Sequence, residues 1–461
     1  MSLNPDRLFP ADPATRKIAR TLYELVRDAP IVSPHGHTDP VWWGQNPAFS
    51  NAAELFVIPD HYVTRMLVSQ GVPFAELGIG APADPRAVWR RFADHAHLFL
   101  GTPSALWLEH AFETVFGLDQ PLSSETADLY FDTITDALAQ PGFRPRALYD
   151  RFGIEVIATT DSALDDLAQH DAVAASDWQG HVIPTYRPDA VTDPDHPAFL
   201  ANLDRLAALT GQDTRNWQGY LQAHRDRRAA FIARGCTASD HGHPTAKTLD
   251  LTESAAQQLF ADVLAGRGDA EAFRAQMLTE FARMSLDDGL VMQLHAGSRR
   301  NHHHQSFAAL GPDRGFDIPQ RTDFVRDLQP LLNMCGMDPR FRLILFTLDE
   351  STYARELAPL AGAYPCLRLG PPWWFHDSFE GIRRYREAVT ETAGFWNTAG
   401  FNDDTRALCS IPARHDVARR CDSAYLAELV VTHRVRMEDA ATLAPLLATG
   451  LARQAYNLDP R

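Results

Sequence analysis

The chain has few cysteines, and no two of them are closely spaced enough to form a CxxC pair. The five are Cys236, Cys335, Cys366, Cys409 and Cys421, an odd number scattered over the second half of the sequence. This pattern argues against a disulfide framework and against a zinc ribbon. It is typical of free thiols in a reducing compartment.

Positive charge is in deficit as well: 43 Lys and Arg stand against 59 Asp and Glu, a formal net charge of −16. A field of that sign repels nucleic acid and anionic membrane surfaces. No uninterrupted apolar run approaches the roughly 20 residues of a membrane-spanning helix. The first residues also lack the basic and apolar regions of a signal peptide. We therefore predict a cytoplasmic protein without a nucleic-acid or membrane partner.

Eight short apolar segments recur along the 461 residues, separated by longer amphipathic or polar stretches. They span residues 31–38, 155–161, 181–187, 235–240, 290–297, 342–348, 366–374 and 395–403. Runs of this length are typical of strands buried on both faces, and the helical patterns between them indicate βαβ units. Eight such strands favour an α/β fold of the (β/α)8 TIM-barrel type, although a doubly wound sheet also fits.

The interval between the first two segments is more than a hundred residues long, far beyond a normal strand-to-helix connection. Its composition is helical, with amphipathic patterns at 52–56, 62–69, 85–97, 105–116 and 126–138. We therefore predict a helical insertion, or cap, formed by residues 41–150. The barrel itself would consist of residues 1–40 and 151–461.

The strongest local motif is Ser33-Pro34-His35-Gly36-His37, at the end of the first predicted strand. Two histidines at positions i and i+2 of a strand point to the same side, so both imidazoles can reach one metal ion. A pair of ordinary loop histidines is the simpler alternative in a chain with 19 of them. The position favours the metal, because barrel active sites lie at the carboxyl ends of the strands.

Other predicted strands end in chemically active side chains too. These are Arg187, Asp240, His295, the pair Trp373 and Trp374, and Asp404 with Arg406. Unpaired charge is rare in a core, although a salt bridge or a helix N-cap also explains any single one, Asp240 and Asp404 included. The sixth strand ends without a histidine, so the set suits one divalent ion better than two. We predict zinc, although manganese, iron and cobalt accept the same ligand types.

The arginines near the strand ends indicate a binding site for an acidic ligand. Arg187, Arg300 and Arg406 could each pair with a carboxylate ligand through two hydrogen bonds, which would create a cationic pocket inside an anionic protein. His61-Tyr62 opens a predicted helix of the insertion and could lean over the barrel mouth. An amphipathic residue with a solvated hydroxyl explains Tyr62 equally well. We interpret the run from His302 to His304 as a solvated loop.

The combination of these motifs resembles the uronate isomerase (glucuronate isomerase) family of the amidohydrolase superfamily. The stretches that carry the resemblance are Pro34-His35-Gly36-His37, Asp60-His61-Tyr62, Tyr186-Arg187-Pro188-Asp189, Met292-Gln293-Leu294-His295, Trp373-Trp374-Phe375 and Asp404-Thr405-Arg406. Many hydrolases share HxH alone, whereas the whole order is specific. The chain departs from the family at Thr405, where serine is usual, and at Ser162-Ala163, where Asp-Pro is usual. These departures leave the preferred sugar open.

The resemblance implies reversible isomerisation of D-glucuronate to D-fructuronate and of D-galacturonate to D-tagaturonate, with one divalent metal ion. It would make His35, His37 and Asp404 the metal ligands, with His295 at or beside the metal. The implied catalytic residues are Asp404, Tyr62, Arg406 and His295. The implied substrate contacts are His61, Arg187, Asp240, Arg300, Trp373, Trp374 and Arg406. The hypothesis is proton transfer through a cis-enediol, shuttled by Tyr62 or Asp404.

Two other functions remain possible at this stage. The first is a mononuclear metal-dependent hydrolase of the same superfamily that acts on an acidic sugar-like substrate. The second is a catalytically silent protein that only binds a sugar acid. The large insertion and exposed aromatic residues also predict a homo-oligomer, with a uronate as its small-molecule partner.

Overall fold

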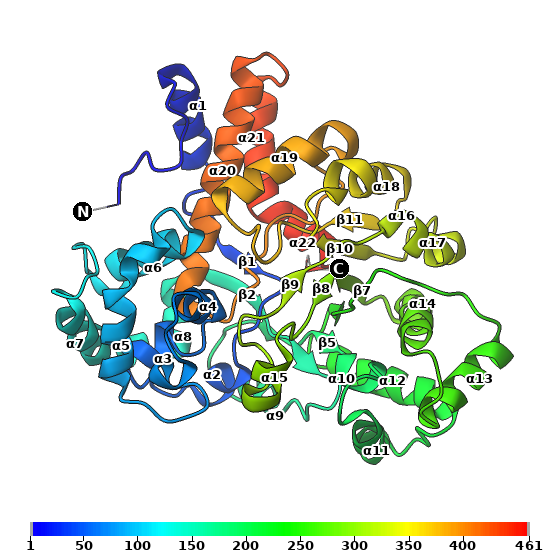
Figure 1. Ribbon diagram of the computed structural model, residues 1–461. Helices are drawn as coiled ribbons and strands as arrows, with labels where there is room; N and C mark the ends of the chain where they lie inside the picture. Colours follow the sequence, from blue (N-terminus) through cyan, green and yellow to red (C-terminus); the bar gives the residue numbers. More distant parts are fainter. Residues whose placement is uncertain (1–2, 459–461) are drawn as a thin grey trace.

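The computed structural model describes residues 3–458 and shows strands in a ring, with helices around and beside it (Figure 1). The barrel strands are β1 (Ile31–Ser33), β2 (Ile154–Ala158), β3 (Asp161–Ser162), β4 (Val182–Ile183), β5 (Tyr186–Arg187), β6 (Ala238–His241), β7 (Val291–Ala296), β10 (Leu343–Thr347) and β11 (Leu367–Leu369). Nearly every residue of these strands is buried, which explains why their sequences are almost continuously apolar.

The strands pair in parallel around the ring. One sheet has the order β1-β2-β4 and the other β11-β10-β7-β6-β5-β3. Because β3 continues β2 and β5 continues β4, the two sheets form one wall. The wall continues through a bridge between Leu369 and Thr398, and it returns to the first strand where the His37 amide donates to the Thr405 carbonyl at 3.0 Å. These pairings confirm the predicted (β/α)8 barrel.

Several strands end earlier than the apolar pattern predicts. β1 stops at Ser33 rather than at residue 38, β11 stops at Leu369 rather than at 374, and residues 395–403 contribute a single bridge. Just beyond the predicted ends, Phe375 and Asp404 have φ values of 69° and 41°, in the left-handed region, which extended strands do not contain. The sequence overestimates these strands because the apolar runs continue into the loops that follow.

Helices cover the outside of the barrel and continue beyond its last strand. They are α1 (Pro13–Glu24), α9 (Ala168–Ala174), α10 (Asp189–Thr192), α11 (Phe199–Thr210), α12 (Trp217–Ile232), α13 (Glu253–Leu264), α14 (Ala270–Asp288), α16 (Phe324–Asp327), α17 (Gln329–Cys335), η4 (Tyr353–Leu357), α18 (Ala358–Ala363), α19 (Phe379–Ala393), η5 (Leu408–Ser410), α20 (Ile411–Val431), α21 (Met437–Pro445), η6 (Leu446–Gly450) and α22 (Leu451–Ala455). α19 shows how the local sequence specifies such a helix. The Ser378 hydroxyl caps its N-terminus by accepting a hydrogen bond from the Gly381 amide, and Ile382, Tyr385 and Val389 form its buried face. No helix within residues 3–458 combines the length and hydrophobicity needed to cross a bilayer.

The long interval after β1 is helical, as predicted, and lies beside the barrel (blue and cyan in Figure 1). Its elements are α2 (Pro40–Gln45), α3 (Ala52–Phe56), α4 (His61–Ser69), η1 (Phe74–Leu77), α5 (Pro85–Asp94), η2 (Ala96–Phe99), α6 (Pro103–Phe116), α7 (Ala127–Leu138), η3 (Pro141–Phe143) and α8 (Pro145–Arg151). Trp89 and Phe112 of this segment share one apolar cluster with Ile31 and Ile154 of the barrel. The division of the chain at residues 41–150 stays a prediction.

A short hairpin follows β7 at the carboxyl end of the barrel. It consists of β8 (Ser298–Arg299) and β9 (Ile318–Pro319), with helix α15 (His304–Leu310) between them. Leu310 packs against the apolar cluster of the helical segment, and the Phe316 ring lies tilted by 58° to that of Phe74, with centroids 6.2 Å apart. The hairpin therefore connects the mouth of the barrel to the helices beside it.

A buried carboxyl group at the end of the second strand makes stability depend on pH. Burial raises the pKa of Asp161 to about 7, while its side chain accepts the Thr159 hydroxyl hydrogen at 2.7 Å. Because the unfolded group ionises near 3.8, stability is lost as the pH rises through this window. Asp161→Asn keeps an acceptor and removes the charge, so we expect its thermal midpoint to exceed wild type at pH 8 and to converge with it below pH 4.5.

The matched control for this comparison is Asp171→Asn, which alters an exposed carboxylate that pairs with Arg234 at 2.8 Å. This surface substitution should leave the pH profile of the thermal midpoint nearly unchanged. Equal midpoints for Asp161→Asn and wild type at pH 8 would show that the buried carboxyl group carries no such penalty.

Candidate active site

A cavity of about 190 Å³ lies at the carboxyl ends of the barrel strands. Its lining consists of His35, His37, Asp60, His61, Tyr62, Arg187, Asp240, His295, Arg300, Asp313, Trp373, Trp374, Asp404, Thr405, Arg406, Ala407 and Arg414. Every residue that the sequence singled out as a ligand, a catalytic group or a substrate contact lies on this wall. The volume is below the roughly 300–1,000 Å³ of pockets for drug-sized molecules, so the cavity suits a small ligand.

Three of these side chains form a compact group of possible metal ligands. The Nε2 atoms of His35 and His37 lie 3.3 Å and 3.0 Å from Oδ1 of Asp404, and all three atoms lie within 4.8 Å of one another. Two imidazole nitrogens and a carboxylate oxygen are donors that zinc and neighbouring transition metals accept. The chemistry of this donor set fits one divalent ion.

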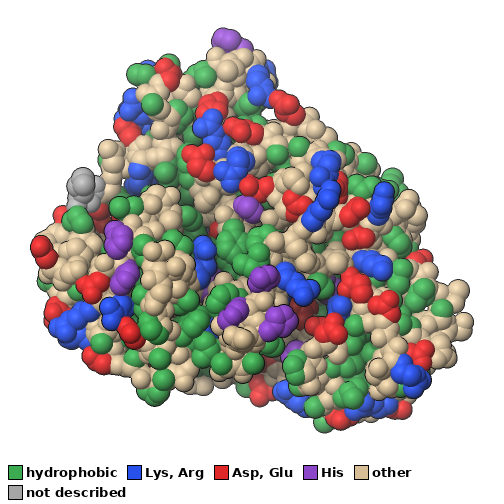
Figure 2. All heavy atoms as spheres, in the orientation of Figure 1, with side chains coloured by type: hydrophobic (Ala, Val, Ile, Leu, Met, Phe, Trp, Pro, Cys, Tyr) green, Lys and Arg blue, Asp and Glu red, His purple; other side chains and the backbone are tan. Residues whose placement is uncertain are grey.

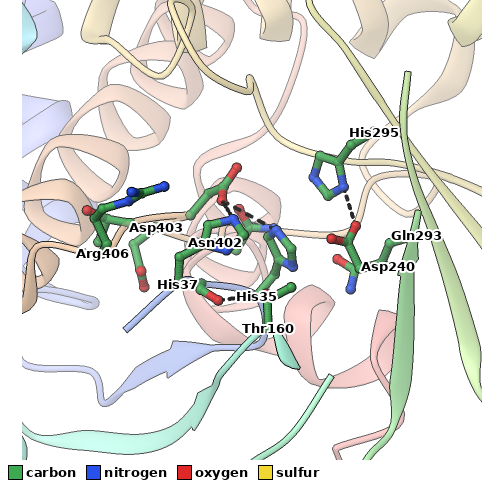
Figure 3. A network of polar contacts seen from close by, with 12 residues as sticks. His35, His37, Thr160, Asp240, Gln293, His295, Asn402, Asp403 and Arg406 are labelled. Atoms are coloured by element: carbon green, nitrogen blue, oxygen red, sulfur yellow. Dashed lines mark hydrogen bonds and ion pairs between the residues drawn. The ribbon is translucent and has the colours of Figure 1, made fainter. Parts of the chain in front are cut away.

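The two histidines reach this position from a loop, which corrects the prediction that they lie on a strand. Both follow the end of β1, and their rings are perpendicular, with centroids 5.2 Å apart. The Thr160 hydroxyl fixes the loop by donating to the Gly36 carbonyl at 2.8 Å (Figure 3). A Cβ atom at Gly36 would lie 3.4 Å from Asp403 Oδ1, an ordinary van der Waals contact, so the loop runs close to residue 403.

Asp404 adopts a backbone conformation that is uncommon for residues other than glycine, with φ of 41°. Such strain is concentrated at functional sites, where the surrounding structure maintains it. Burial alone would raise the pKa of Asp404, but the adjacent His35 and His37 hold it well below its usual value. Asp404 is therefore ionised, and it does not cap a helix, because the next helical turn begins only at Leu408.

A second group surrounds His295, on β7. Its Nδ1 atom lies 2.5 Å from Asp240 Oδ1 (Figure 3). The other carboxylate oxygen of Asp240 lies 3.5 Å from Arg187 Nε. The hydrogen bond to the carboxylate assigns the imidazole proton to Nδ1 and leaves Nε2 as an acceptor. This Nε2 atom is buried without a hydrogen-bond partner, and the ring stacks on His35 with centroids 4.7 Å apart.

Asp240 lies within β6 and therefore does not cap a helix, which was the simpler explanation for its position. Burial would raise the pKa of its carboxyl group, but His295 and Arg187 hold this pKa well below the usual value. The group is consequently charged at the bottom of the cavity. It fixes the orientation of His295 beside the candidate metal ligands.

Three arginines line the cavity, Arg187 from strand β5 and Arg300 and Arg406 from loops, and each pairs with a protein carboxylate. The pairs are Arg187 with Asp189 at 2.9 Å, Arg300 with Asp317 at 2.9 Å, and Arg406 with Asp313 at 3.4 Å. A Cβ atom at Gly242 would lie 2.6 Å from Arg187 Nη2 and 3.5 Å from Arg300 Nη2, so glycine lets both guanidinium groups converge. The side chains of Arg300 and Arg406 are 39% and 37% exposed, and Arg406 has the longest of the three contacts with a carboxylate.

Aromatic rings form the opposite part of the wall. The Trp373 ring lies edge-on to His295 with centroids 4.8 Å apart, and Trp374 lies 4.8 Å from His61. Burial lowers the pKa of His61 to about 3, so this imidazole is neutral at physiological pH. Figure 2 shows histidine side chains gathered near the centre of the face that carries the barrel mouth.

The structure corrects the simpler explanation for Tyr62, a solvated hydroxyl on an amphipathic helix. Tyr62 is buried near the start of α4, where the Asp60 carboxylate accepts from its amide at 2.8 Å and caps the helix. Its hydroxyl donates to Asp377 Oδ2 at 2.8 Å. Burial and the charge of Asp377 raise the pKa of Tyr62 well above its usual value, so the phenol keeps its proton.

From the sequence, no individual role was predicted for several residues that line the cavity or hold its walls, although Asp60 and Thr405 belong to the stretches that carry the resemblance. These are Asp60, Asp313, Thr405, Ala407 and Arg414 in the lining, and Asp377 behind Tyr62. Asp60 has a readable signal, because an Asp before an apolar helix is an N-cap. Asp313 and Asp377 lie in loops that carry no such pattern.

The histidine run after β8 lies outside the candidate metal centre, in agreement with its interpretation as a solvated loop. His302, His303 and His304 are exposed, and the His303 ring caps α15 by accepting from the Ser306 amide at 3.3 Å. Neither of the two metal-capable groups found within residues 3–458 includes them. Consecutive loop residues point in different directions and therefore do not converge on one ion.

Comparisons with known proteins place these features in a family context. The sequence model of the family described as glucuronate isomerase matches residues 13–449. The chain is 62% identical over 461 residues to a uronate isomerase of Rhizorhabdus wittichii, covering 99% of both chains. It is 60% identical to a uronate isomerase of Phenylobacterium zucineum over 467 residues, covering 100% of this chain and 97% of the relative.

Solved structures show the same relationship. The crystal structure of glucuronate isomerase from Caulobacter crescentus superposes with a TM-score of 0.99 at 56% identity, covering 100% of this chain and 98% of that one. The crystal structure of uronate isomerase from Thermotoga maritima gives a TM-score of 0.92 at 25% identity, covering 99% and 100%. Both comparisons extend over the barrel and the helices beside it.

Proposed function

Because the chain belongs to the glucuronate isomerase family, we propose that it interconverts D-glucuronate with D-fructuronate and D-galacturonate with D-tagaturonate. The enzyme is thus an aldose–ketose isomerase, an intramolecular oxidoreductase. The assignment of the substrate rests on the composition of the cavity. The cavity combines a His-His-Asp ligand group with three arginines in a space that suits one small acidic molecule.

The proposal includes one divalent ion, zinc, held by His35, His37 and Asp404. Support comes from the three converging donor atoms and from the unpartnered Nε2 of His295 beside them. When bound, the ion would supply a Lewis acid that polarises the oxygens around the sugar carbonyl. Elemental analysis of the purified protein identifies the metal.

The cationic residues account for recognition of a uronate. Arg406 is accessible and makes only a 3.4 Å contact with Asp313, so a substrate carboxylate can take the place of that partner. Arg187 and Arg300 contribute further positive charge from the neighbouring wall. His61, Asp240, Trp373 and Trp374 would complete the contacts to the hydroxyl groups and to the apolar face of the sugar.

The reaction moves a proton from carbon 2 to carbon 1 and another between their oxygens. A base must lie within hydrogen-bond reach of the carbon-bound proton, and the enediol that forms requires stabilisation. The ionised Asp404 and the Nε2 lone pair of His295 are proton acceptors in the cavity. Tyr62, which keeps its proton, can form a hydrogen bond with the oxygens of the sugar.

A metal-dependent hydrolase of the same superfamily is the second candidate. Against it stands β10, which ends at Thr347 and contributes no histidine to the cavity. The three arginines also have no required role in activating water. Membership of the isomerase family supports the isomerase over this alternative.

One assay separates the candidate functions. The purified, metal-replete protein is incubated with D-glucuronate and with D-galacturonate, and ketouronate formation is followed together with ligand-induced thermal stabilisation. We expect ketouronate from at least one of the two sugars. Stabilisation without turnover would instead identify a silent binding protein, and no product with a folded, metal-loaded protein would exclude the isomerase.

The proposal also extends to the cellular setting. All five cysteines are buried and unpaired, which supports a reducing, cytoplasmic environment. Trp396 and Met337 are 58% and 68% exposed, and exposed apolar side chains of this size support assembly into a homo-oligomer.

A further inference from the structure

Behind Tyr62 lies the carboxyl group of Asp377, which is nearly buried and does not line the cavity. Asp377, in the loop between β11 and α19, accepts two hydrogen bonds on a single oxygen. The Tyr62 hydroxyl donates to its Oδ2 atom at 2.8 Å, and Arg414 Nη1 donates to the same atom at 2.7 Å. Arg414 Nη1 also donates to the Asp403 carbonyl at 3.1 Å. The network thus links Tyr62 to the residue that precedes Asp404.

Four elements hold this network in place. Tyr62 lies on α4, Arg414 on α20, Asp377 in the loop after β11, and Trp107 on α6. The Arg414 guanidinium lies 3.5 Å from the centroid of the Trp107 ring, and Trp107 meets Tyr62 edge-on with centroids 5.6 Å apart. Because helices beside the barrel and loops of the barrel both contribute, the orientation of the Tyr62 ring depends on how the two pack together.

Burial makes the hydrogen bonds of this network strong determinants of geometry. The side chains of Arg414 and Asp377 are only 5% and 10% exposed, so each charge requires the other. The phenol keeps its proton, and that proton is directed at Asp377. Tyr62 lines the cavity, and because its hydroxyl hydrogen is engaged by Asp377, the hydroxyl can offer a lone pair to a substrate hydroxyl.

We propose that Asp377 is a positioning residue for the isomerisation, acting through Tyr62. Its carboxylate fixes both the direction of the Tyr62 hydroxyl hydrogen and the rotation of the phenol. Tyr62 therefore meets the sugar as a hydrogen-bond acceptor in a defined orientation. This role rests on the proposed isomerase activity, because it concerns the orientation of a group toward the uronate.

A double-mutant cycle between the two residues tests the proposal. The kcat and KM for the preferred uronate are measured for wild type, Y62F, D377A and the double variant. We expect D377A to lower kcat about tenfold in the wild-type background but no more than about twofold in the Y62F background, with a smaller change in KM. Equal fold losses in the two backgrounds would overturn the positioning role.

Asp422 provides a matched control, because it is another buried aspartate paired with an arginine, Arg386, at 2.7 Å. It lies outside the cavity lining, so D422A should reduce stability and affect kcat by the same factor with or without Y62F. A coupling to Y62F as large as that of D377A would mean that any buried ion pair gives this result. That outcome would also overturn the proposal.

D377A leaves Arg414 buried without its partner and can fail to fold. D377N keeps an oxygen that accepts both hydrogen bonds, so we expect it to fold and to retain more kcat than D377A. If D377A is insoluble, the cycle is measured with D377N, whose smaller loss should vanish in the Y62F background; persistence of that loss overturns the proposal. A wild-type protein without turnover would overturn the proposed function, and this role with it.

Discussion

The His35→Asn variant is expected to lose at least about 100-fold in turnover together with its bound metal. His35 belongs to both groups of possible ligands, with Nε2 3.3 Å from Asp404 and its ring stacked on His295. Loss of a residue that only orients a metal ligand already costs about 10–100-fold in activity or metal affinity, so the loss of a ligand should cost more. Steady-state kinetics and elemental analysis of the same preparation measure both effects.

The control for His35→Asn is His302→Asn, in the exposed loop after β8. It removes an imidazole without touching the cavity, so turnover and metal content should match wild type. Circular dichroism and the thermal midpoint show whether the barrel of His35→Asn remains folded. Wild-type turnover in a folded His35→Asn variant would show that the histidine motif is not part of the active site.

The Arg406→Met variant is expected to bind uronates about 10–100-fold more weakly, an effect that appears mainly in KM. A hydrogen bond to a charged group contributes about 1.5–3 kcal/mol, and a carboxylate that faces Arg406 would lose such a bond. Removal of the guanidinium also leaves Asp313 facing the cavity without its 3.4 Å partner, which should repel the substrate further. Initial rates over a range of uronate concentrations separate KM from kcat.

Arg326→Met serves as the control for Arg406→Met. Its side chain is 88% exposed and pairs with Asp323 at 3.9 Å, away from the cavity lining. The substitution removes the same charge from the protein, so an effect of net charge alone would appear in both variants. An unchanged KM in Arg406→Met would show that this arginine does not bind the carboxylate.

The sequence predicts the barrel well because its strands are buried on both faces. Segments such as 290–297 and 342–348 are mostly apolar, and they correspond to β7 and β10 within one residue at each end. The same signal fails at the strand ends, where Trp373 and Trp374 extend an apolar run into a loop that lines the cavity. Hydrophobicity reports burial, and aromatic residues of an active-site wall are buried as well.

The candidate site could be predicted where chemistry is concentrated in short motifs. The His35-Gly36-His37 stretch and Asp404 are visible for this reason, although their approach depends on a loop and on a left-handed backbone conformation. The contact between Tyr62 and Asp377 joins residues 315 positions apart. No local pattern shows that the hydroxyl of a buried tyrosine donates a hydrogen bond to one particular aspartate. Only the packing of α4 against the barrel brings the two residues together.

Proton NMR of D-glucuronate incubated with the metal-replete protein in heavy water tests the central claim most directly. The account predicts signals of D-fructuronate, with solvent deuterium at carbon 1 of the product, because an enediol takes up its new proton from an exchangeable group. Ketouronate without any deuterium would contradict exchange of the transferred proton with solvent during turnover. The absence of ketouronate from both D-glucuronate and D-galacturonate would contradict the assignment of this cavity as a uronate isomerase site.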